Sequence, residues 1–184
     1  MKSRRWMGCA MLALAASVLI IGNEANSGKK SKDSLDAIIE ALRKGDGKAA
    51  NALAAKAARE EEALEHVMES LERKAPAPLR GSIEKVIRNM SKEAFTPAEL
   101  KKNGKALTIM AYRIGAVAKV CQAAPPKVNK GKKTKDRWLT YTEGVFAGSQ
   151  DLLKAIKTSA AQDAKTAAVR INSNCNSCHS IWRD

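Results

Sequence analysis

The residues with the clearest chemistry lie in one short segment, NCNSCHSIWRD. Cys175 and Cys178 are three residues apart, and His179 follows directly. This is the C-x-x-C-H pattern by which a c-type haem is attached to protein. On a helix, two thiols about one turn apart can each add to a vinyl group of the porphyrin, and the adjacent imidazole can ligate the iron. The pattern predicts one covalent haem c, with His179 as an iron ligand.

Three other interpretations of these cysteines are weaker. A redox dithiol normally opens a helix after a strand, and this sequence offers no such setting. A structural zinc site needs four ligands, and outside the motif only Cys121 and His66 remain as candidates. A disulfide between cysteines three apart on one helix is geometrically poor. We therefore favour haem attachment, and we expect Cys121 to be an inert buried thiol.

The first residues indicate export. A basic start with Lys2, Arg4 and Arg5 precedes an apolar run over residues 7–21, and small residues follow. This pattern is typical of a secretory signal peptide, which we place at residues 1–27. The apolar run is short for a membrane span, so the alternative of an uncleaved anchor is less favoured. We expect the remaining chain, residues 28–184, to be a single periplasmic domain without stable membrane insertion.

The chain is strongly basic, with a formal net charge of +14. The export signal and the small number of aromatic residues argue against a nucleic-acid partner. Much of the positive charge lies in KVNKGKKTKDR, residues 127–137. We interpret this segment as a solvated, mobile loop between helices; a docking patch for an acidic redox partner is the alternative.

Composition and periodicity predict an all-α fold. Alanine, leucine, lysine and glutamate dominate, and apolar residues recur at helical spacing. Thr96-Pro97-Ala98-Glu99 and Ser159-Ala160-Ala161-Gln162 are predicted to be capping boxes that open two of the helices. We expect an antiparallel four-helix bundle preceded by a short extra helix. The extra helix is predicted at 34–44 and the bundle helices at 48–74, 97–122, 135–158 and 160–182.

The chain from residue 28 onward resembles the cytochrome c-prime superfamily, and most closely its low-spin, methionine-ligated members. The resemblance rests on three segments: WLTYTEGVFAGSQDLLKAI, AAVRINSNCNSCHSIWRD and MAYRIGAVAKV. It implies a haem at the end of the fourth bundle helix and a distal residue supplied by the first. The stretch that matches the distal position is LEHVMESLERK, which implies Met68 as the sixth iron ligand. It also implies that Arg183 pairs with a haem propionate and that Trp182 packs near the haem.

The helical stripe supports Met68 independently, because Leu64, Met68 and Leu71 share one face. His66 is about 200° from Met68 around the helix and is expected to point to solvent. A core-filling role is the alternative for Met68, and it is the role we expect for Met90 and Met110. Trp138 is expected to be a core anchor.

These features predict an exported one-electron carrier with a single His/Met-ligated haem. A five-coordinate haem that binds nitric oxide or carbon monoxide is the alternative, and a structural zinc protein is a third. No arrangement of a nucleophile with a base, and no carboxylate pair, suggests an enzyme. The resemblance also implies a homodimer through the first two bundle helices, a surface that the extra helix could cover.

Overall fold

The structure is a computed structural model that describes residues 24–127 and 129–183. The fold is all-α, as predicted, and no strand is assigned within the described ranges. Their seven helices are α1 (Glu24–Arg43), α2 (Gly47–Ala57), α3 (Ala63–Glu72), α4 (Ile83–Lys92), α5 (Pro97–Ala123), α6 (Lys135–Thr158) and α7 (Ala161–Trp182). The predicted signal peptide lies outside the described residues, except for its last four, which belong to α1.

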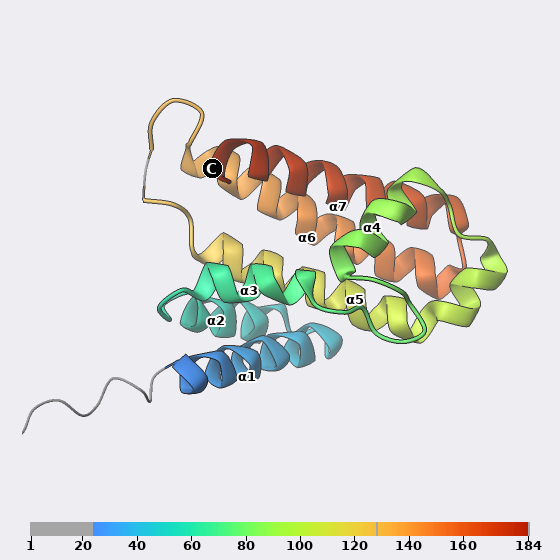
Figure 1. The fold of residues 1–184 in the computed structure, drawn as a ribbon, viewed down its shortest axis with the longest axis horizontal. Coiled ribbons are helices and arrows are strands. Elements are labelled where there is room, and N and C mark those ends of the chain that lie inside the picture. The colour runs from blue at the N-terminus through green and yellow to red at the C-terminus, as the bar shows by residue number, and fades with distance from the viewer. Residues whose placement is uncertain (1–23, 128, 184) are drawn as a thin grey trace, which may run out of the picture.

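Three long helices, α5, α6 and α7, form the centre of the fold (Figure 1). Helix α6 packs along both α5 and α7, and these two contacts are the most extensive between helices. Helices α1, α2 and α3 all pack against α5, whereas α4 packs against α7 and touches α3. The other four helices therefore cover these three on two sides.

The contact between α6 and α7 depends on glycine. A Cβ atom at Gly148 of α6 would lie 2.7 Å from Cγ1 of Ile171 in α7, closer than real Cβ contacts allow. Gly144, one turn earlier, would clash with the side chain of Asn174 in the same way. Gly144 and Gly148 thus let the two helices approach closely. Because α7 carries the C-x-x-C-H motif, this approach fixes where the motif lies.

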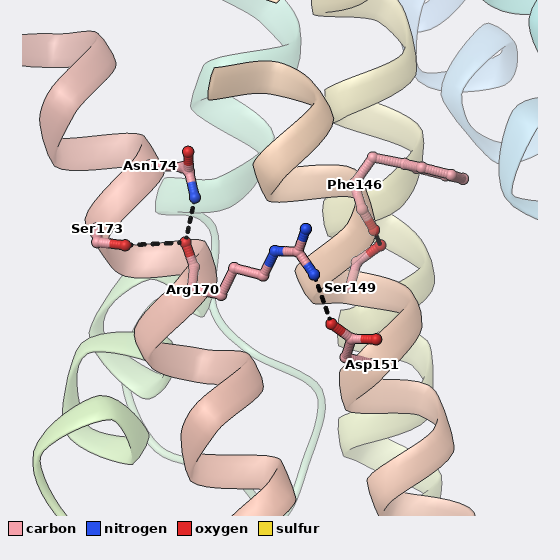
Figure 2. Close-up of polar contacts among 6 residues, drawn as sticks. All are labelled: Phe146, Ser149, Asp151, Arg170, Ser173 and Asn174. Carbon is pink, nitrogen blue, oxygen red and sulfur yellow. Dashed lines mark hydrogen bonds and ion pairs between the residues drawn. The ribbon is translucent and has the colours of Figure 1, made fainter. Parts of the chain in front are cut away.

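Polar contacts along the same pair of helices are mostly local (Figure 2). The Arg170 guanidinium donates to the Asp151 carboxylate across the pair at 2.9 Å, and the Asn174 amide donates to the Arg170 carbonyl at 2.8 Å. Both members of the ion pair are about half exposed, so the pair contributes little stability. Burial of apolar side chains is therefore the main source of stability between α6 and α7.

The predicted helix 48–74 is wrong as a single helix. The structure ends α2 at Ala57 and begins α3 at Ala63, with Glu62 in a left-handed conformation at φ 58°. The two buried faces explain the break. A continuous helix would carry the buried stripe of α2 onto Glu61, and would place the buried stripe of α3 on nearly the opposite side. The break brings both stripes onto the core and leaves Glu61 exposed.

The helix ends agree only in part with the predicted signals. The capping box at α5 is confirmed, because the Glu99 backbone N–H donates to the Thr96 hydroxyl and the Thr96 backbone N–H donates to the Glu99 carboxylate. The predicted box at Ser159 is wrong. Ser159 instead terminates α6 at φ 53°, and Ala160 precedes α7 without a side-chain cap. The backbone N–H of Ala160 donates to the Ala155 carbonyl, which closes α6.

Two other segments differ from the predicted boundaries. Helix α1 begins ten residues before the predicted extra helix, at Glu24 instead of 34. The basic segment 127–137 is a loop only as far as Thr134, because the hydroxyl of Thr134 accepts from the Arg137 N–H and caps α6.

Candidate functional site

A cavity of about 740 Å³ lies among five helices, α3 to α7. Its apolar lining includes members of both hydrophobic clusters of the protein, such as Ile114 of one and Val117 of the other. Ligand cavities in proteins typically have volumes of roughly 300–1,000 Å³ and mostly apolar walls. The cavity is thus of a size and polarity that suit an organic cofactor.

One wall belongs to the last turns of α7. Cys175, Cys178 and His179 all line the cavity, and so does Arg183 just after the helix. The backbone N–H of Arg183 donates to the His179 carbonyl at 2.9 Å and closes the helix there. Cys178 is buried, whereas Cys175 and His179 are half-buried and Arg183 is exposed. The spacing on one helix therefore presents both thiols and the imidazole to the same space.

The thiols that line the cavity do not ionise readily. Burial raises the pKa of Cys175 to about 12, with smaller contributions from Cys178 and Glu84, and burial raises the pKa of Cys178 to about 11. Cys121 lines the cavity from α5, and burial beside the other two thiols raises its pKa to about 12. Reactive redox dithiols have lowered thiol pKa values. The surroundings of these cysteines therefore do not favour a redox dithiol.

Another part of the lining belongs to α3. Leu64, Met68 and Leu71 line the cavity from this helix, as their shared stripe suggested. Met68 is half-buried against the second hydrophobic cluster, whereas Met90 and Met110 are only 1% and 0% exposed. Met68 thus borders an open space, while the other two methionines fill the core. His66 does not line the cavity and is half-buried, less exposed than we expected.

An aromatic group lies at the end of the cavity where α7 terminates. Trp182 meets Trp138 edge to face, with ring centroids 5.3 Å apart, and meets Tyr141 at 6.3 Å. All three residues line the cavity. The Trp138 indole donates to the Cys121 carbonyl at 2.6 Å and is buried, so the prediction of a core anchor is confirmed.

The Trp182 indole nitrogen, unlike that of Trp138, has no hydrogen bond within the described residues. It is also buried. An unpaired buried donor is uncommon, and each instance needs an explanation. Arg113 Nε is a second such donor and does not line the cavity. The Trp182 nitrogen has almost no surface open to the cavity, so an acceptor on a bound molecule would reach it only if the indole ring shifted. The apolar lining, with Arg183 at the end of α7, fits an apolar cofactor that carries polar substituents, as a haem does.

Carboxylates mark the edge of the cavity on one side. Glu65, Glu69 and Glu72 of α3 and Glu84 of α4 are exposed and also line it. They do not form a metal centre with the motif. Within the described residues, no three His, Cys, Asp or Glu side chains are grouped in a way that could hold a metal ion. The described residues therefore offer the zinc alternative no preformed group of ligands.

Several lining residues were not predicted from the sequence as part of the site. Tyr141 was not singled out, although it lies one turn after Trp138. The apolar contribution of α4, Ile83 and Ile87, was also not expected there. The signal was present, because Ile83, Val86, Ile87 and Met90 form a clear amphipathic pattern, but nothing in that pattern indicates which helix it covers.

Comparisons with protein families, with curated proteins and with solved structures find no match for this chain. In the part of the chain that the structure describes, no helix combines the length and the apolar character needed to cross a membrane. The case for a function therefore rests on the residues and on the geometry of the cavity.

Proposed function

We propose that this chain is an exported c-type cytochrome that transfers one electron at a time through a single covalent haem. One observation carries the proposal. The five residues selected from the sequence alone line one cavity, namely Cys175, Cys178, His179, Met68 and Arg183. Four of them lie within residues 175–183 and share the cavity because of their spacing, so the informative convergence is that of Met68, which α3 brings to the same cavity from a distant part of the chain.

The resemblance to the cytochrome c-prime superfamily supports the same proposal and suggests how the helices correspond. Helices α5, α6 and α7 would be three members of a four-helix bundle. Helices α3 and α4 would share the fourth position, since α3 packs on α5, α4 packs on α7, and the two contact each other. Helices α1 and α2 would then be additions outside the bundle, packed on α5.

A bound haem c supplies an iron that alternates between two oxidation states. The chain's own residues would set its properties. Cys175 and Cys178 would form the thioether links, and His179 would ligate the iron from the same helix. Met68 would ligate from α3 with a soft thioether, which raises the reduction potential. With His179 and Met68 both bound to the iron, the site would suit electron transfer and not catalysis on a bound substrate.

Two further residues would bind the polar edge of the haem. The Trp182 indole N–H is a buried donor without a protein partner, and the Arg183 guanidinium lies at the exposed end of the same cavity. Both are suited to a propionate, the indole only if its ring shifts, because a carboxylate accepts charge-assisted hydrogen bonds. Attachment of haem c outside the cytoplasm agrees with the export signal predicted at residues 1–27.

The test is extraction of the protein purified from a host that attaches haem c. Acid–acetone should leave the colour on the polypeptide, and the mass should increase by one haem. A Cys175→Ala/Cys178→Ala variant should lose the covalent haem, whereas the control Cys121→Ala should keep it. Complete extraction of the haem, or stoichiometric zinc in its place, would contradict the proposal.

The absorption spectrum separates the carrier from the gas-binding alternative. A His/Met-ligated haem should be low-spin in both oxidation states and should not bind carbon monoxide in the native protein. A high-spin spectrum with ready binding of carbon monoxide would instead support the five-coordinate alternative.

A further inference from the structure

The basic loop between α5 and α6 lies at one end of the cavity. It begins three residues after Cys121 and ends four residues before Trp138, and both of these residues line the cavity. In Figure 1 this loop is at the end of the molecule where α7 terminates. The positive charge of the loop is therefore adjacent to the aromatic group formed by Trp138, Trp182 and Tyr141.

The charged side chains of this region point to solvent. Lys127, Lys130 and Lys132 in the loop are exposed, as are Lys135 and Arg137 in the first turn of α6. Asp136 is the one acidic residue in the segment 127–137. Like charges on a short exposed segment repel one another, so their concentration here adds nothing to the stability of the fold.

Acidic residues also line the cavity. Glu65, Glu69 and Glu72 extend along the exposed side of α3. Basic residues of the loop and acidic residues of α3 therefore both lie near this cavity, and both contribute to the electric field that an approaching charged molecule meets.

We propose that the basic surface, Lys127, Lys130, Lys132, Lys135 and Arg137, docks an acidic face of the protein that exchanges electrons with this chain. The inference rests on the proposed function. An acidic face would be attracted by the basic surface and would therefore approach at the aromatic end of the cavity, next to the C-x-x-C-H motif.

The expected kinetics follow from electrostatic steering. Attraction between opposite charges raises association rates by roughly 10- to 1,000-fold, and salt at physiological ionic strength screens it beyond about 8 Å. The rate of electron exchange with an anionic reagent should accordingly be high at low ionic strength and should fall as salt is added.

The experiment uses the full haem-loaded protein and stopped-flow oxidation by ferricyanide, an anionic reagent. Lys130→Glu/Lys132→Glu should lower the second-order rate by roughly 3- to 10-fold at low salt and flatten its salt dependence. The control, Lys101→Glu/Lys154→Glu, has the same net charge change at exposed positions on the sides of α5 and α6 away from the loop, and it should change the rate much less. Poly-L-glutamate, as a mimic of an acidic protein face, should slow the unaltered protein and the control but not the loop variant.

Equal rates in the loop variant and the control would overturn the docking proposal while leaving the haem proposal intact. So would inhibition by poly-L-glutamate that is the same in all three proteins. A chain that carries no haem would overturn both proposals, and the spectrum recorded before mixing distinguishes that result from a failure of docking.

Discussion

Met68 on α3 and His179 on α7 line the same cavity from different helices. The position of Met68 points to a role as an iron ligand, because the surroundings of Met68 differ from those of Met90 and Met110. Met90 and Met110 are enclosed by the core, whereas Met68 borders the cavity and is half-buried. This difference allows the ligand role of Met68 to be separated from a packing role.

We predict that Met68→Ala converts the haem spectrum to high spin and opens the iron to carbon monoxide. Met90→Ala should leave the spectrum low-spin but lower the free energy of unfolding by about 2–5 kcal/mol, because it leaves a cavity in the core. Absorption spectra and urea unfolding of both variants provide the measurement. An unchanged spectrum in Met68→Ala would show that Met68 is a packing residue and not an iron ligand.

Substitution of the two tryptophans should have unequal effects. Trp138→Phe removes the buried hydrogen bond to the Cys121 carbonyl, which then keeps only the longer bond from the Ala124 backbone N–H, and this should cost about 0.5–1.5 kcal/mol beyond the lost contact area. Trp182→Phe removes an indole N–H that has no protein partner, so it should cost less in the haem-free chain.

Urea unfolding of the haem-free chains compares the two variants directly, and the unaltered haem-free chain is the reference. Equal losses would mean that the Trp138 hydrogen bond does not contribute to stability.

Gly148 should not tolerate a side chain. Gly148→Ala places a methyl group 2.7 Å from Ile171 and should lower the free energy of unfolding by about 1–3 kcal/mol, since α6 and α7 must separate. Gly47→Ala is the control, because a Cβ there meets no atom within 4 Å and alanine favours the helix. Thermal unfolding measures both, and a neutral Gly148→Ala would show that α7 can shift without loss.

The long helices were predictable because their limits depend on local chemistry. Proline at the first position, with Thr96 and Glu99 around it, specifies the start of α5 within the chain itself. The end of α6 was not predictable in the same way. Ser159, with Gln162 three residues later, suggested an N-terminal capping box for α7. Ser159 instead takes a left-handed conformation that closes the preceding helix.

The break between α2 and α3 was not predictable from local signals. Residues 58–62 contain neither proline nor glycine, and their intrinsic preferences allow a helix. The break arises because Ala54 and Val67 must both be buried, and they lie on incompatible sides of one straight helix. Tertiary packing decides the outcome there.

The residues that line the cavity also differ in whether the sequence alone could identify them. The C-x-x-C-H motif was identified from residue type and spacing, because its chemistry is local to a few positions, whereas Met68 was identified from the resemblance to the cytochrome c-prime superfamily together with its helical stripe. Tyr141 and Ile87 were not, because their place in the cavity depends on how α4 and α6 are arranged around α7.

The division of the predicted helix also affects how firmly the two sides of the cavity are held. Helix α3 has ten residues, and isolated helices of fewer than about 12 residues are marginal in water, so its order depends on packing against its neighbours. Helix α7 has 22 residues and lies against both α6 and α4. Segments with few buried contacts open locally before the rest of a protein unfolds. A haem ligand carried by α3 would be released in such an opening while the covalent links on α7 stayed in place, so Met68 would be a more labile ligand than His179.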